Sequence, residues 1–123
     1  MSTEILVVED SPTQALRLKL TLERKGLKVS LANTGRAGIE MAALLLPAAV
    51  VLDVNLPDID GFQVCQAIKS HSATAATPVV MLTVKDRAVD TITGLDAGAD
   101  AYIPKDDFAE VNLVQALRDL AIL

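Results

Sequence analysis

The stretch Ile5-Leu6-Val7-Val8-Glu9-Asp10 decides the fold, because an unbroken apolar run turns acidic at its end. A short apolar run without polar alternation is typical of a strand in a parallel sheet covered by helices. The pattern recurs three times, and each run leads to a residue that can contact a phosphate or its metal: Val50-Val51-Leu52 to Asp53, Val79-Val80-Met81-Leu82 to Thr83, and Tyr102-Ile103-Pro104 to Lys105. Because the carboxyl ends of parallel strands share one edge of the sheet, the sequence predicts that these polar side chains meet at one site.

The polar residues at this predicted edge are three acids, one hydroxyl and one ammonium. Three carboxylates attract a divalent cation, whereas a hydroxyl and an ammonium suit the anionic oxygens of a phosphoryl group. The combination therefore predicts the transfer of a phosphoryl group to a carboxylate.

Composition narrows the class of protein further. The 123 residues suffice for one domain, and 51% of them are hydrophobic, mostly Ala, Leu and Val. The net charge of -5 argues against a surface that binds nucleic acid directly, since such surfaces need clustered Lys and Arg. Cys65 is the single cysteine, so no disulfide can form within the chain, which fits a reducing compartment. The N-terminus lacks the features of a signal peptide and no apolar run is long enough to span a membrane, so we expect a cytoplasmic protein without membrane contacts.

Strands alternate with helices along the chain. The expected strands cover residues 5–8, 27–31, 49–53, 79–83 and 101–103. Helices are expected to follow each strand, and they begin near residues 12, 35, 62, 86 and 107. Ser11 and Gln14 are expected to form a capping box for the first helix, and Asp107 and Glu110 one for the last.

Strict alternation of this kind predicts an α/β fold, a doubly wound five-stranded parallel sheet with helices on both faces. The second strand alone alternates apolar with polar residues, at Leu27, Val29 and Leu31, so we place it at an edge. An edge position for this strand favours the order 2-1-3-4-5. We see no linker, internal repeat or low-complexity segment.

Four segments carry a resemblance to a known family: Ile5 to Ser11, Val51 to Gly61, Leu82-Thr83, and Gly98 to Lys105. Together they resemble the response-regulator receiver domain of two-component signalling, and the likeness covers essentially all of residues 1–123. The resemblance implies a flavodoxin-like fold similar to that of chemotaxis receivers. It also implies that a histidine kinase or a phosphotransfer protein phosphorylates Asp53, with Mg²⁺ as the cofactor.

The resemblance assigns a role to each acid. Asp53 would be the nucleophile that forms an acyl phosphate. Glu9, Asp10 and Asp53 would supply oxygen ligands to Mg²⁺, and the backbone carbonyl of Asn55 would add another.

The resemblance also implies a switch. Lys105 would pair with Asp53 before transfer and with a phosphoryl oxygen afterwards. Thr83 would bond the new phosphoryl oxygen, and Tyr102 would turn inward as a rotameric switch. The changing surface, which a downstream target protein would read, is expected around the fourth helix, the fifth strand and the last helix, with Arg87, Asp90, Tyr102 and Asp107 on it.

The chain departs from the family near Lys105. A proline usually follows this lysine in the family, whereas here Asp106 follows and Pro104 precedes it. A cis bond before a residue other than proline is costly, so we expect a trans bond or a differently shaped loop. Val84 also stands where many relatives have a smaller residue.

Two other functions remain open. A degenerate receiver would act as an interaction module without phosphorylation, although the intact set of site residues argues against it. A phosphatase of the haloacid-dehalogenase type also has an Asp at the end of an apolar strand, but it would need a second Asp where Asn55 stands.

We expect that the chain is not an enzyme, apart from catalysing its own phosphorylation and dephosphorylation. Nothing in the chain resembles an output domain, so we expect a stand-alone receiver or relay, although a receiver that is part of a larger protein would have the same sequence pattern.

Overall fold

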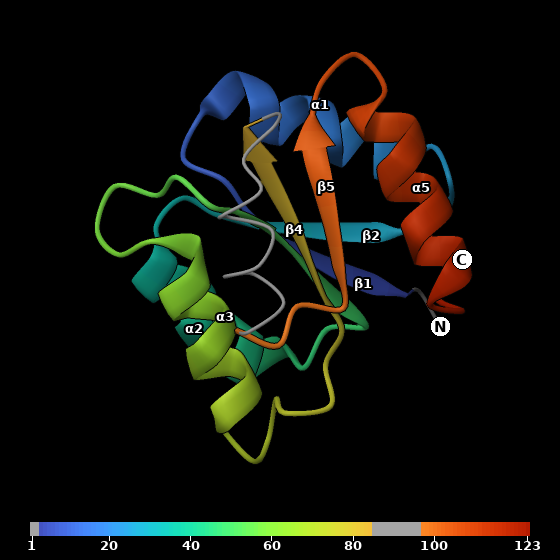
Figure 1. The fold of residues 1–123 in the computed structure, drawn as a ribbon. Coiled ribbons are helices and arrows are strands. Elements are labelled where there is room, and N and C mark those ends of the chain that lie inside the picture. The colour runs from blue at the N-terminus through green and yellow to red at the C-terminus, as the bar shows by residue number, and fades with distance from the viewer. Residues whose placement is uncertain (1–2, 85–96) are drawn as a thin grey trace.

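The computed structural model describes residues 3–84 and 97–123, and within them a single parallel sheet forms the centre of the molecule (Figure 1). Its strands are β1 (Glu4–Val8), β2 (Lys28–Ala32), β3 (Ala49–Asp53), β4 (Val79–Val84) and β5 (Ala101–Lys105). The described helices are α1 (Pro12–Glu23), α2 (Gly35–Leu45), α3 (Gly61–Ser70) and α5 (Ala109–Asp119). All strand pairs are parallel and the order is β2-β1-β3-β4-β5, which confirms the predicted topology. The helix expected from residue 86 lies outside the described residues.

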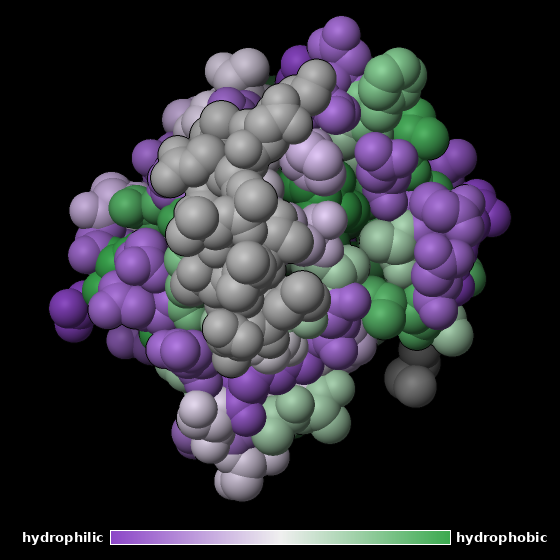
Figure 2. Space-filling model, viewed as in Figure 1, coloured by the Kyte–Doolittle hydropathy of each residue, from purple (hydrophilic) through white to green (hydrophobic). Residues whose placement is uncertain are grey.

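The helices cover the sheet in two layers, with α1 and α5 on one face and α2 and α3 on the other (Figure 1). Alternate residues of each central strand therefore point into two separate aliphatic cores. In β1, for example, Ile5 and Val7 pack on the α1 and α5 side, whereas Leu6 and Val8 pack on the other side. Burial on both faces is why these strands read as unbroken apolar runs. Hydrophilic residues make up most of the visible outer rim of the molecule (Figure 2).

The edge position of β2 is confirmed, but its expected alternation is only partly correct. Val29 is buried as expected, whereas Leu31 is 39% exposed and Ala32 beside it is buried. An edge strand packs on one neighbour only, so a large apolar side chain there can remain partly in water.

The starts of α1 and α5 both differ from the capping boxes that the sequence predicts. Ser11 Oγ accepts a hydrogen bond from the Gln14 N–H as expected, but the Gln14 side chain turns elsewhere. The box of Asp107 and Glu110 is wrong, because α5 begins after Phe108 without a side-chain cap. The reason is that β5 continues through Lys105, beyond the expected end at residue 103, so Asp107 falls in the turn before the helix.

Pro104 lies inside β5, as the apolar run Tyr102-Ile103-Pro104 indicates, although the expected strand ended at residue 103. The position is tolerated because β5 has a strand partner on one side only in the described sheet, and proline within sheets is largely confined to such strands. The extra residues carry Lys105 to the same edge as the end of β3. None of the helices in residues 3–84 and 97–123 is long and apolar enough to cross a membrane.

Candidate metal and phosphoryl-acceptor site

Three carboxylates meet at the carboxyl edge of the sheet, as the sequence predicts. Glu9 and Asp10 follow β1, and Asp53 is the last residue of β3. One carboxylate oxygen from each lies within 4.8 Å of the others. Glu9 and Asp53 are buried, whereas Asp10 is exposed at the rim. A ligand could therefore approach past Asp10 and reach two acids that water barely contacts.

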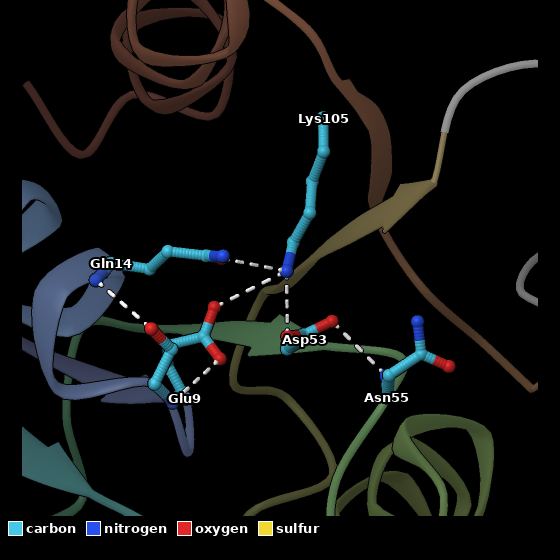
Figure 3. A network of polar contacts seen from close by, with 6 residues as sticks. Glu9, Gln14, Asp53, Asn55 and Lys105 are labelled. Carbon is cyan, nitrogen blue, oxygen red and sulfur yellow. Dashed lines mark hydrogen bonds and ion pairs between the residues drawn. The ribbon is translucent and has the colours of Figure 1, made fainter.

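Lys105 reaches into this group from the end of β5, across the end of β4 (Figure 3). Its Nζ donates to Asp53 Oδ2 at 2.6 Å and to Glu9 Oε1 at 3.2 Å. One ammonium thus holds two buried carboxylates, and the third carboxylate adds a further negative charge. This excess of negative charge suits a divalent cation with oxygen ligands.

The electrostatics of the site appear in two pKa shifts. Burial, with the neighbouring Asp53 as the next cause, raises the pKa of Glu9 from 4.5 to about 7. Burial alone would lower the pKa of Lys105, but its hydrogen bond and charge interaction with Asp53, aided by Glu9, outweigh burial and raise it. Lys105 is therefore a permanent cation, whereas Glu9 gains or loses its charge near neutrality.

The backbone around Asp53 fixes the direction of its side chain. The Asn55 N–H donates to Asp53 Oδ1 at 3.0 Å, so both carboxylate oxygens of Asp53 are engaged. Gly61 packs so closely beneath this segment that a Cβ there would collide with the Asp53 carbonyl oxygen and the Val54 Cα. Glycine at position 61 is therefore required by close approach of the backbone.

Thr83 lies on β4, beside the acidic group. It is buried, and within the described part of the chain its Oγ1 has no hydrogen-bond partner. An unpaired buried hydroxyl is costly unless some state of the protein satisfies it.

Tyr102 is partly buried on β5 and packs against the core on the α2 and α3 side. In the sheet it is level with Met81, while Thr83 is level with Pro104. The two proposed switch residues therefore lie on adjacent strands, offset from each other by two residues in the register of the sheet. Of the expected switch surface, Arg87 and Asp90 lie outside the described residues.

The described part of the chain contains no cis peptide bond, so the bond between Lys105 and Asp106 is trans. This agrees with the expectation from the absent proline.

One contact at the site was missed by sequence reasoning. Gln14, in the first turn of α1, accepts a hydrogen bond from Lys105 Nζ at 3.0 Å through its Oε1 (Figure 3). The sequence pattern pointed to a capping role for Gln14. The only indication in the sequence that Gln14 could reach the site was its position about one helical turn after Glu9 and Asp10.

Comparison with known proteins identifies the family. The family model of the response regulator receiver domain matches residues 5–118. The chain is 39% identical to the response regulator MprA of Mycolicibacterium vanbaalenii, over 98% of this chain and 51% of that protein. For MprA of Mycobacterium ulcerans the identity is 40%, over 98% of this chain and 50% of the relative. The chain thus spans about half the length of the curated relatives it matches.

Solved structures give the same result. A putative response regulator from Chloroflexus aurantiacus superposes with a TM-score of 0.92 at 32% identity, covering 98% of both chains. The chemotaxis response regulator CheY4 of Vibrio cholerae has a TM-score of 0.89 at 27% identity, covering 98% of this chain and 99% of that one. The receiver domain of a sensor histidine kinase from Pseudomonas aeruginosa has a TM-score of 0.86 at 27% identity, covering 96% and 97%. That structure has a magnesium ion coordinated in its active site cleft.

Proposed function

The chain belongs to the response regulator receiver domain family of two-component signalling, and we propose that it accepts a phosphoryl group on the Asp53 side chain. One observation carries the proposal: the buried Asp53 carboxylate ends β3 between the ammonium of Lys105 and two further carboxylates. We take residues 1–123 as a single receiver domain.

In the transfer step, an Asp53 carboxylate oxygen would attack phosphorus. A new O–P bond forms, and the bond from phosphorus to the donor breaks, which is a P–N bond for a phosphohistidine donor and a P–O bond for acetyl phosphate. The leaving group departs with the bonding electrons. Lys105 would then shift from the Asp53 oxygen to a phosphoryl oxygen, where its charge stabilises the product.

The donor set fits Mg²⁺, because three carboxylates share one ammonium. Glu9, Asp10 and Asp53, with the backbone carbonyl of Asn55, would hold the ion. When bound, it supplies the positive charge that lets two anionic groups meet.

The defining experiment is labelling with acetyl phosphate in the presence and absence of Mg²⁺. We expect labelling only with Mg²⁺ and only when Asp53 is intact. Asp53→Asn is nearly isosteric and cannot attack phosphorus, so it should abolish labelling while the domain stays folded. A degenerate receiver would not label in either condition. Labelling of the Asp53→Asn variant at the wild-type rate would disprove the assignment of the nucleophile.

We further propose that phosphorylation switches a protein-binding face through Thr83 and Tyr102. The unpaired Thr83 hydroxyl supports this proposal, since a phosphoryl oxygen would supply its missing partner. In NMR spectra, a stable phosphoryl mimic with Mg²⁺ should shift amide signals of β5 and α5 as well as those near Asp53. Thr83→Ala should keep the shifts near Asp53 and lose the distant ones.

The partners follow from the proposed chemistry. A histidine kinase or a phosphotransfer protein would donate the phosphoryl group, and a downstream protein would read the switched face. As a receiver domain the chain is not a true enzyme, and we propose that its catalysis is limited to its own phosphorylation and dephosphorylation. We also propose a cytoplasmic location, with no direct contact of this domain with nucleic acid, in keeping with its net charge of -5.

A further inference from the structure

We propose that Gln14 is a positioning residue that holds the ammonium of Lys105 in place during phosphoryl transfer. The inference rests on the proposed roles of Asp53 and Lys105 and adds a residue to them. Its basis is the hydrogen bond from Lys105 Nζ to Gln14 Oε1, at 3.0 Å.

The Lys105 ammonium has three protons to donate, and the structure provides three acceptors. They are Asp53 Oδ2 at the end of β3, Glu9 Oε1 after β1, and Gln14 Oε1 on α1. The three acceptors come from three different elements, so together they fix the position of Nζ. Figure 3 shows the Gln14 and Lys105 side chains extending toward each other beside the two acids.

Gln14 differs from the other two acceptors because it is neutral. Once a metal and a phosphoryl group engage the oxygens of Glu9 and Asp53, those acceptors become less available to Lys105. The amide of Gln14 is unaffected and can keep its bond. It also adds no further negative charge to a pocket that already contains three carboxylates.

The surroundings show what Lys105 would do without this bond. A hollow of about 380 Å³ opens beside the ammonium, between α1 and α5. Lys105 and Gln14 line it together with the acidic residues Asp106, Asp107 and Glu110. The carboxylates of Asp106 and Asp107 offer the ammonium an alternative position away from Asp53, whereas Glu110 already accepts from the Thr21 hydroxyl and pairs with Arg17. Gln14 therefore keeps Lys105 turned toward the acceptor.

The start of α1 fixes the backbone of Gln14 and leaves its side chain available to bond Lys105. Pro12 opens the helix, and Ser11 Oγ accepts the Gln14 N–H at 3.3 Å, which fixes the backbone of Gln14. The reciprocal capping bond from the Gln14 side chain is not made, and the amide reaches Lys105 instead.

The test compares Gln14→Met with Gln115→Met. Gln115 is a matched control because it is also an exposed helical glutamine, bonded to Asp119 Oδ1 through its Nε2 at 2.9 Å. Two quantities are measured: the rate of labelling by acetyl phosphate with Mg²⁺, and the ¹H–¹⁵N signal of the Lys105 ammonium without metal. Gln14→Met should slow labelling by about three- to tenfold, the ratio that a typical hydrogen bond gives where water competes for the same groups, and weaken the ammonium signal. Gln14→Glu keeps an acceptor oxygen and should retain the signal, and Gln115→Met should change neither quantity.

A labelling rate for Gln14→Met equal to that of the wild type would overturn the proposal. So would slower labelling with an unchanged Lys105 signal, since Gln14 would then act by another route. If the wild type itself does not label, the proposed function fails and the positioning role fails with it. The ammonium signal of the metal-free protein distinguishes that case, because it reports on the contact between Gln14 and Lys105 without phosphorylation.

Discussion

Two partly buried lysines lie at opposite ends of the sheet, and their surroundings differ in the balance of charge. At the amino end, Lys69 on α3 donates to Asp100 Oδ2 at 2.7 Å and to the Thr77 carbonyl at 2.8 Å. The same Asp100 oxygen also accepts from the Val79 N–H at 2.8 Å. One cation there meets one anion. At the carboxyl end, Lys105 meets two buried carboxylates, and Asp10 adds a third.

The difference distinguishes a structural ion pair from a site. The pair of Lys69 and Asp100 satisfies its own charges and ties α3 to the starts of β4 and β5. The group around Lys105 is left with an excess of negative charge, in a place where Asp53 and Glu9 are almost inaccessible to water. A further cation bound to such a group would stabilise it.

The largest effect on the free energy of unfolding should come from replacing the two lysines, and the loss should be greater for Lys105 than for Lys69. Lys105→Met leaves Glu9 and Asp53 buried without a counter-ion, and we expect a loss of about 3 kcal/mol in the free energy of unfolding without metal. Lys69→Met should cost only about 1 kcal/mol, because Asp100 is partly exposed and keeps its bond from the Val79 N–H. Chemical denaturation of both variants gives the values.

Magnesium should then separate the two variants. It should restore part of the stability of Lys105→Met, by supplying a positive charge to the same carboxylates, and give Lys69→Met no more than it gives the wild type. Equal recovery in both variants would mean that the acid group is not a metal site.

Magnesium should also stabilise the wild type. At ten times its dissociation constant, a ligand that binds only the folded state adds about 1.4 kcal/mol to the free energy of unfolding. Asp10→Ala should remove most of this gain, since it takes away one of three neighbouring carboxylates. Asp100→Asn is the control, because it removes a carboxylate of the other lysine and should keep the gain. A wild-type melting temperature that millimolar Mg²⁺ does not move would contradict the site.

The two ends of the sheet also differ in how far the sequence predicts them. Apolar runs ending in Asp53, Thr83 and Lys105 predicted the strands, their direction and the edge where the acids meet, because burial on both faces and parallel pairing follow from local pattern. The pair of Lys69 and Asp100 joins residues that are 31 positions apart, and nothing in the spacing of the sequence links the two. Its position depends on how α3 packs.

Side-chain competition set a second limit on prediction. Gln14 and Glu110 each occupy the third position after a capping residue in the sequence, yet both side chains bind elsewhere. Gln14 accepts from Lys105, and Glu110 accepts from the Thr21 hydroxyl at 3.1 Å. A cap is one bond among several available, and the stronger or better-placed partner is known only once the helices are assembled.

The pH dependence of stability should mark the carboxyl end. The Glu9 pKa lies at about 7 in the folded protein against an ordinary 4.5, so folding favours the protonated form. This contribution to stability is fully present below about pH 4.5 and is lost as the pH rises through about 7. Without metal, the free energy of unfolding should therefore fall across this range. Glu9→Gln should flatten the fall and Asp100→Asn should not, as chemical denaturation at several pH values would test. If the slope stays unchanged in Glu9→Gln, Glu9 is not the titrating group.

The smallest effect concerns Cys65, on the buried face of α3. Its Sγ donates to the Ala97 carbonyl at 3.4 Å, and burial raises its pKa to about 11. The thiol should therefore react with a disulfide reagent only when α3 opens, since the thiolate is the reactive form. Lys69→Met removes one tie of α3 and should speed the reaction roughly fivefold, the ratio that about 1 kcal/mol of opening energy gives. Lys105→Met leaves that contact of α3 in place and should react at the wild-type rate, although it lowers the free energy of unfolding more. A greater acceleration in Lys105→Met than in Lys69→Met would mean that the thiol becomes accessible through global unfolding, and the two ends of the sheet would then not be independent in stability.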